Sequence, residues 1–342
     1  MKRVSITARV QLVLLAAGIA FAVVAPYIFN SFIVGLLSLA LISGLFAMSV
    51  DLLSGYAGLV TLGQAGITAA AAYGVGYMAN KVGAGIPAQL LVGLAAGMVA
   101  SAIFAVMAMR SGGVYFMMIT LAQGMIVWGL SIRLYKITGA ENGLTGIDRP
   151  SFLSEYWQYY WFVLAVVLVC SLMLVIAVRS PFGAAVKGLR ESESRMRMLG
   201  YNPALQKFYV FMVAGFFASV GGILLVFLNG FISPSAATLA ASAMGVLQAI
   251  LGGIGTLIGP MIGAFIIVGI QNIVSTYLER WPTLMGVIFI VVVLFARKGI
   301  VGAISIGWRR WLERREQAAS GDSAIDAGDL PDELALESSE PR

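Results

Sequence analysis

Apolar residues run from residue 10 to residue 296 in long stretches that contain almost no charge. Such stretches predict helices that cross a lipid bilayer, because about 20 apolar residues span its hydrocarbon core. We therefore predict an all-α, polytopic helical membrane protein with about ten transmembrane helices. The candidate spans are residues 10–28, 32–52, 67–79, 88–109, 114–132, 160–178, 208–228, 239–251, 261–277 and 283–296.

Two glycine clusters interrupt these stretches, each beside a short candidate span. They consist of Gly55, Gly58, Gly63 and Gly66, and of Gly252, Gly253, Gly255 and Gly259. Gly- or Pro-interrupted segments in the two halves of a transporter point to its central site. The first cluster is either a broken element on a solute path or a turn followed by a close-packed glycine helix, and the pattern favours neither. The second cluster, followed by Pro260, predicts a backbone break between the eighth and ninth spans.

The longest loop between spans, residues 179–207, has the signals of a short amphipathic helix. These signals are Ser180 and Pro181 at its start, the pairs Glu191/Arg195 and Glu193/Arg197, the stop at Gly200 and a second start at Asn202 and Pro203. The alternatives are a solvated connector and a helix lying on lipid headgroups. Because the other loops are short, a partner protein that pushes on this loop explains its structure better.

The distribution of positive charge predicts the topology. If the N-terminus is cytoplasmic, 17 of the 22 Lys and Arg residues lie inside, which requires an even number of spans and both termini in the cytoplasm. The expected organisation is a cytoplasmic N-terminus (1–9), a transmembrane domain (10–300) with loop 179–207 in the cytoplasm, and a basic, then acidic, disordered tail (301–342). The first span could instead be a cleaved signal peptide, but we expect it to remain, because cleavage would spoil the even count.

Composition excludes several functional classes. The chain of 342 residues is 60% hydrophobic and only 11% charged, so it is not a soluble globular protein. It contains no His and a single Cys, Cys170, which excludes His-based catalysis, zinc sites and a disulfide framework. The net charge of +6 flanks the helices and does not indicate nucleic acid. We expect no catalytic residue, no metal and no cofactor.

The energy source is predicted to lie on another chain. The sequence has no Gly-x-x-x-x-Gly-Lys-Ser/Thr loop for ATP, and Asp51 is the one acidic residue within the candidate spans. Ion-coupled carriers usually keep ionisable groups near the midplane of the membrane. An external motor is therefore the better hypothesis, and an ion-coupled secondary carrier or a purely structural membrane subunit is the alternative.

Five blocks in order give the chain a family resemblance. They are residues 51–65 (DLLSGYAGLVTLGQA), 113–122 (GVYFMMITLA), 138–146 (TGAENGLTG), 180–200 (SPFGAAVKGLRESESRMRMLG) and 251–260 (LGGIGTLIGP). Over residues 32–302 the chain resembles LivM-type permease subunits of branched-chain amino acid ABC transporters. It departs from the family pattern at Ala184, Gly188, Ser192 and Met196, and in lacking a Pro within 295–300.

The resemblance implies half of a translocation path in the bacterial inner membrane, for branched-chain or similar small amino acids. The implied partners are a LivH-type permease, two cytoplasmic ATPases and an external solute-binding protein, within the lipid bilayer. The implied ATPase-coupling residues are Arg190, Glu191, Glu193, Leu199 and Gly200, and the candidate path residues are Tyr56, Thr61, Gln64, Tyr115, Thr120, Gln123 and Gln248. Each polar path residue has an interhelical hydrogen bond as its alternative role. Urea and short amides remain alternative substrates.

Overall fold

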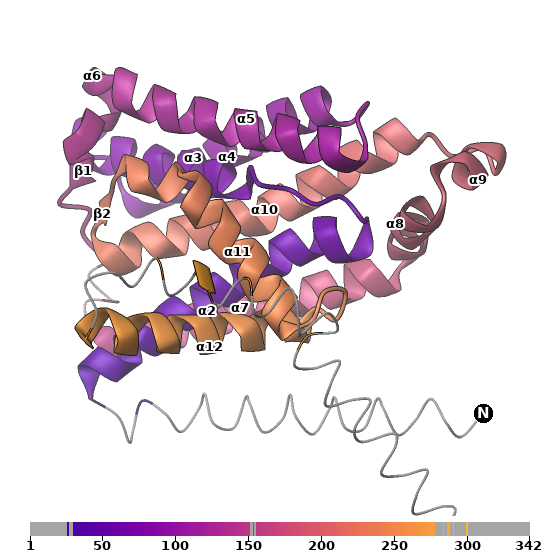
Figure 1. The fold of residues 1–342 in the computed structure, drawn as a ribbon. Coiled ribbons are helices and arrows are strands. Elements are labelled where there is room, and N and C mark those ends of the chain that lie inside the picture. The colour runs from indigo at the N-terminus through magenta and orange to yellow at the C-terminus, as the bar shows by residue number, and fades with distance from the viewer. Residues whose placement is uncertain are drawn as a thin grey trace, which may run out of the picture.

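The computed structural model describes residues 30–150 and 155–277, together with positions 26, 153, 283, 286, 287, 290 and 299. This part of the chain is a bundle of long helices, as predicted (Figure 1). The long helices are α2 (Ser31–Asp51), α3 (Gln64–Tyr77), α4 (Ile86–Ala108), α5 (Gly113–Arg133), α7 (Tyr156–Arg179), α10 (Pro203–Asn229), α11 (Leu239–Gly252) and α12 (Ile258–Tyr277). The short elements are η1 (Leu52–Tyr56), η2 (Met78–Val82), α6 (Tyr135–Thr138), η3 (Ala140–Asn142), β1 (Leu144–Thr145), α8 (Pro181–Glu191), α9 (Glu193–Met198), β2 (Phe231–Ile232) and η5 (Pro234–Ala237).

Six of the described helices are long and apolar enough to cross a membrane. They are Ser31–Tyr56, Ile86–Ala108, Gly113–Arg133, Tyr156–Arg179, Pro203–Asn229 and Ile258–Ser275. The predicted spans 67–79 and 239–251 correspond to α3 and α11, which have 14 residues each and are too short to cross alone. The predicted spans 10–28 and 283–296 lie outside the described residues, apart from isolated positions. The structure thus supports a polytopic helical protein, while the count of ten stays a prediction.

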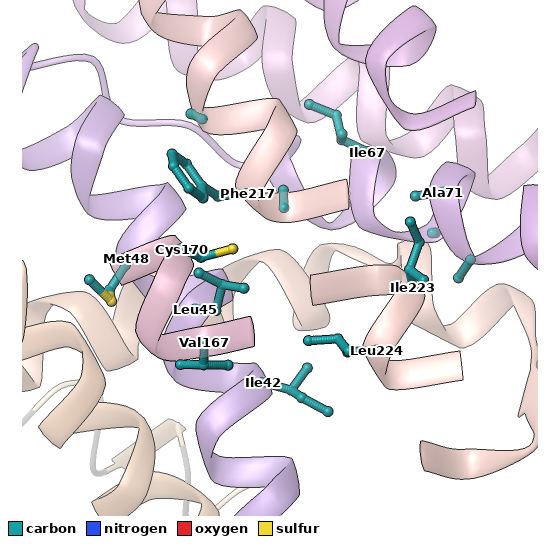
Figure 2. Close-up of a cluster of buried hydrophobic side chains, with 14 of the residues drawn as sticks. Ile42, Leu45, Met48, Ile67, Ala71, Val167, Cys170, Phe217, Ile223 and Leu224 are labelled. Carbon is teal, nitrogen blue, oxygen red and sulfur yellow. The ribbon is translucent and has the colours of Figure 1, made fainter. Parts of the chain in front are cut away.

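The core lies between α2, α3, α7 and α10. Figure 2 shows side chains from all four helices meeting there, among them Leu45 of α2, Ile67 of α3, Val167 of α7 and Phe217 of α10. In the bilayer, where lipid is as apolar as these side chains, packing contacts and hydrogen bonds hold helices together instead of the hydrophobic effect. The stability of this bundle therefore depends more on how closely its helices approach one another than on the apolar area that they bury.

Small residues bring α4 and α10 together. A Cβ atom at Gly97 would meet the side chain of Ser219, and a Cβ atom at Gly215 would meet that of Ser101. Each helix thus offers a glycine and a serine four residues apart, the small-residue spacing that lets membrane helices approach closely. The Ser101 hydroxyl also donates to the carbonyl oxygen of Phe211 at 3.1 Å, which satisfies a polar group that lipid cannot.

One end of the bundle carries β1 and β2, and the opposite end carries α8 and α9 (Figure 1). At the strand end, Arg149 donates to the carbonyl oxygens of Phe227 and Leu228 at 2.9 and 2.7 Å, and its guanidinium lies 4.8 Å from the ring centres of Tyr156 and Tyr159. A cation at the C-terminal carbonyls of α10 is favourable, since that end of a helix carries partial negative charge.

Loop 179–207 contains two short helices where the sequence predicted one. The chain is extended at Ser192, with φ −165°, so α8 ends at Glu191 and α9 begins at Glu193. The Ser192 hydroxyl accepts from the backbone N–H of Arg195 at 3.3 Å. A serine that caps a helix competes with continuing one, which explains why the single-helix prediction was wrong.

The predicted starts and stops of this loop are confirmed in part. Gly200 follows α9 with φ +86°, and the Asn202 side chain caps α10 by accepting from the N–H groups of Ala204 and Leu205 at 3.1 and 3.4 Å. Ser180 precedes α8 as predicted, but its hydroxyl donates back to the carbonyl oxygen of Ala177 at 2.7 Å and does not cap α8.

Candidate functional site

The first glycine cluster surrounds an interruption between α2 and α3. After η1, residues 57–63 run without helix to the start of α3. Ala57, Leu59 and Thr61 in this stretch are at most 5% exposed, whereas Gly58 and Val60 are exposed, so protein encloses the non-helical backbone on one side only. Enclosure is the condition under which irregular backbone is tolerated at membrane depth. Gly58 adopts φ +71°, which glycine does without strain, whereas Gly55 and Gly66 lie in the flanking helical turns and Gly63 directly precedes α3.

The second cluster forms the predicted break between α11 and α12. α11 ends at Gly252, and Gly253 and Gly255 have φ of +121° and +82°. Leu257 also has a positive φ, +57°, which a side-chain-bearing residue rarely adopts. Gly259 lies in the first turn of α12, against the backbone of Gly252. The break is therefore confirmed, and the surroundings hold its backbone in an uncommon conformation.

Asp51 joins the two interruptions. One oxygen of its carboxylate accepts from the backbone N–H of Gly255 at 2.6 Å, and the other accepts from that of Leu257 at 3.3 Å. Asp51 is the last residue of α2, and its side chain is fully buried. The two N–H groups lie just before α12, where a helix start carries partial positive charge, so a carboxylate is stabilised there. Residues about 200 positions apart in the chain thus share one contact.

Arg190 of α8 contacts the first interruption. Its guanidinium Nη1 donates to the carbonyl oxygen of Gly55, and its aliphatic stem lies where a Cβ atom of Gly58 would be, 2.8 Å from Cγ. One turn earlier, the ammonium of Lys187 lies 5.5 Å from the ring centre of Tyr56. α8 is therefore docked on η1 through two cationic side chains.

Five of the seven candidate path residues are buried inside the chain. Thr61, Gln64, Thr120, Gln123 and Gln248 are each at most 5% exposed. Tyr56 is partly buried against Lys187, and Tyr115 is 75% exposed on α5, apart from the buried set.

The structure brings the first interruption into contact with α5. The Thr120 hydroxyl accepts from the backbone N–H of Leu62 at 3.2 Å, and a Cβ atom at Gly63 would meet the carbonyl oxygen of Thr120. Gln123 donates instead to the carbonyl oxygen of Phe104 at 3.2 Å, which is the interhelical role that the sequence left open.

Gln64 lies at the start of α3 with neither amide atom hydrogen-bonded in the described part of the chain. The next backbone N–H, that of Ala65, donates to the hydroxyl of Ser242 on α11 at 3.4 Å. The amide oxygen of Gln248, also on α11, is buried without a partner among the described residues. A buried amide without partners costs about 1–3 kcal/mol, so these side chains retain hydrogen-bonding capacity that the fold does not use.

The charged residues of loop 179–207 divide into two groups. Glu193 pairs at 2.6 Å with Lys207, which is 4% exposed and donates to the carbonyl oxygen of Ser111 at 2.8 Å. This pairing replaces the predicted pair with Arg197. Glu191 and Arg195 form the other predicted pair, at 3.7 Å, and remain exposed, as do Met198 and Leu199 at the tip. Arg190 and Glu193 thus bind this chain itself, while Glu191 and Leu199 face outward.

Sequence reasoning missed the roles of Asp51, Ser242 and Lys207. Asp51 was recognised only as a lone acidic residue within a span. A buried carboxylate must find hydrogen-bond donors, and a glycine-rich break with free N–H groups is a ready source of them. That signal was present in the sequence. Lys207 and Ser242 carry no such signal.

Long apolar helices, two interrupted spans joined to each other and a short peripheral helix, α8, docked on one of them define a helical membrane permease. The model of the family described as "Branched-chain amino acid transport system / permease component" matches residues 32–296, and the chain belongs to this family. It is 26% identical over 345 residues to the high-affinity branched-chain amino acid transport system permease protein LivM of Escherichia coli K12, covering 92% of this chain and 79% of that protein. The LivM protein of Salmonella typhimurium LT2 is also 26% identical, over 322 residues, covering 85% and 75%.

The chain is therefore a permease subunit of an ABC importer and a multi-pass protein of the inner membrane. It is a transport subunit and not an enzyme. Permeases of this class work with ATPase and binding-protein partners.

Proposed function

We propose that this chain forms half of the translocation path for branched-chain or similar small amino acids. The other half is a LivH-type permease, ATP is hydrolysed by two separate cytoplasmic subunits, and an external solute-binding protein delivers the substrate. Both relatives are named as branched-chain amino acid permeases, which supports this substrate class. In this proposal both termini and loop 179–207 lie in the cytoplasm and the transmembrane domain covers residues 10–300 with ten helices, while the tail 301–342 lies outside the described residues.

The contact between Arg190 and the carbonyl oxygen of Gly55 carries this proposal. It connects the loop on which a cytoplasmic motor acts with an interrupted span inside the membrane. ATP binding closes the motor and shifts the population of permease conformations, because closed motor subunits bind one arrangement of the loop better than the other. The exposed pair Glu191/Arg195 and the exposed tip residue Leu199 offer the motor its contact surface.

The proposed path follows the polar side chains beside the first interruption. Gln64 and Gln248 have amide atoms without a partner among the described residues, Thr61 lies within the interrupted segment, and Thr120 of α5 contacts that segment. Amide and hydroxyl groups suit the zwitterionic head of an amino acid without the cost of a buried fixed charge. Tyr115, exposed on α5, belongs to this path only if the second permease covers that face.

An ion-coupled carrier is the alternative mechanism, and Asp51 is its one acidic candidate among the described parts of the spans. Two backbone N–H groups already occupy its carboxylate, which favours a structural role. Urea and short amides are the alternative substrates.

The test is transport by the complex of this chain with its second permease, its ATPases and its binding protein in proteoliposomes. We expect uptake of labelled leucine, isoleucine or valine that requires both ATP and the binding protein. Uptake by this chain alone, driven by a proton or sodium gradient, would refute the ABC mechanism. ATP-driven uptake of urea or acetamide in place of the amino acids would refute the substrate class.

A further inference from the structure

Two interrupted spans and α8, a short helix outside the bundle of long helices, meet at a single point in this chain, the end of η1. From within the membrane domain, the Asp51 carboxylate binds the N–H groups of Gly255 and Leu257. From outside it, the Arg190 guanidinium binds the carbonyl oxygen of Gly55, four residues after Asp51. Both side chains bind backbone, and no ion pair within 4 Å joins them in the described structure.

The end of η1 is suited to this contact. A helix leaves its last carbonyl groups without intrahelical partners and carries partial negative charge there, so a guanidinium is favourable. The chain then turns away into the irregular segment 57–63, which leaves the Gly55 carbonyl oxygen available. Hydrogen bonds to ionised groups are about twice as strong as neutral ones, and both contacts at this point are of that kind.

Glycine is required on both sides of the contact. A Cβ atom at Gly55 would meet the Asp51 carboxylate and would lie 2.6 Å from the backbone nitrogen of Gly255. A Cβ atom at Gly58 would lie 2.8 Å from Cγ of Arg190. The glycines that mark the break in the sequence therefore also let the two spans and α8 touch.

We propose that Arg190 and Asp51 are positioning residues that make α8, the end of η1 and the start of α12 move together. This inference rests on the proposed function. Arg190 transmits displacement of loop 179–207 to the backbone of η1, and Asp51 transmits it onward to the start of α12. One push from the motor thereby moves both interrupted spans. The outward-facing part of the loop meets the motor, while Arg190 acts inward.

The test uses Arg190→Gln and Asp51→Asn in the complete reconstituted complex, with ATP hydrolysis and substrate uptake measured on the same vesicles. Arg190→Gln keeps a polar side chain on an exposed face of α8 but is too short to reach the Gly55 carbonyl oxygen. Asp51→Asn keeps the size of the side chain but replaces one of its two acceptor oxygens with an NH2 donor, so only one of the two backbone N–H groups keeps its acceptor. Arg110→Gln is the matched control, because Arg110 is exposed and has no side-chain partner in the described residues.

We expect both variants to assemble and hydrolyse ATP, while the ATP consumed per substrate transported rises about tenfold, the factor for losing one strong hydrogen bond in the transmitting state. The control keeps the wild-type ratio. A merely structural role would lower the yield of assembled complex and leave this ratio unchanged, which would overturn the inference. Equal losses of ATP hydrolysis and uptake in Arg190→Gln would place Arg190 at the motor and overturn it too. Failure of the wild-type complex to transport amino acids would instead refute the proposed function.

Discussion

The close approach of α11 and α12 predicts that two glycines of the same helix respond oppositely to alanine. A Cβ atom at Gly263 would meet the carbonyl oxygen of Gln248 and would lie 2.8 Å from the backbone nitrogen of Gly252. These are backbone atoms of α11 and cannot rotate away. At Gly269, six residues further along α12, a Cβ atom would meet no atom of the described residues within 4 Å.

The magnitude follows from two opposing effects. Alanine is favoured over glycine in a helix by up to about 1 kcal/mol, and both variants gain this. Gly263→Ala additionally forces the helices apart, and overpacking of this kind costs about 1–3 kcal/mol. The helix preference cancels in the difference, so Gly263→Ala should be less stable than Gly269→Ala by about 1–3 kcal/mol.

The assay is unfolding of the full-length chain in detergent micelles by titration with a denaturing detergent, followed by tryptophan fluorescence. Gly269→Ala should unfold at or above the wild-type midpoint and Gly263→Ala below it. Equal midpoints for the two variants would show that α11 and α12 do not approach as closely as described. The packing of α11 against α12 would then not hold the N–H groups of Gly255 and Leu257 within hydrogen-bonding distance of Asp51.

Three further predictions concern polar side chains of the candidate site. Gln64→Met should raise the free energy of unfolding by about 1 kcal/mol, because it removes a buried amide that has no partner among the described residues. It should also lower amino acid uptake, and normal uptake would exclude Gln64 from the path. Thr120→Val should destabilise the chain by about 1–2 kcal/mol, because a backbone N–H loses its acceptor, and an unchanged midpoint in the detergent titration would contradict that contact. Glu193→Gln should lower the free energy of unfolding by about 1 kcal/mol, discounted because Glu193 is half-exposed. Its control is Glu191→Gln, which removes the exposed ion pair with Arg195 and should change the free energy of unfolding by less than about 0.5 kcal/mol. Equal changes in the two variants would show that the ion pair between Glu193 and Lys207 does not stabilise the fold.

The helices and both interruptions could be predicted because their causes are local. Apolar length indicates a span, and glycine with proline indicates where a helix stops. The stop at Gly200 and the start at Asn202 belong to the same class of signal, and both are confirmed. The split at Ser192 was missed although its cause is also local, because serine is common both within polar helices and at their caps.

The contacts between the interruptions could not be predicted, because they depend on packing over long sequence distances. The sequence indicates that Asp51 needs donors and that a glycine-rich break can supply them, but it does not show which of the two breaks or which N–H groups, here those of Gly255 and Leu257, bind it. The direction in which loop side chains point has the same difficulty. Arg190 and Glu191 are neighbours and both are exposed, yet Arg190 binds η1 while Glu191 pairs with Arg195 on α9. Helical periodicity separates the faces of α8, but only the fold shows which face meets the bundle.

Asp51 also shows why one acidic residue in an apolar span does not by itself indicate ion coupling. A buried carboxylate is costly unless donors compensate it, and here the donors are two backbone N–H groups at the start of α12. A proton bound to this carboxylate would weaken at least one of those hydrogen bonds, because a neutral acceptor is weaker than a charged one. Proton binding at Asp51 would therefore weaken the contact between the two interrupted spans. An external motor leaves that link intact and can use it, so the placement of this single charge favours ATP-driven transport.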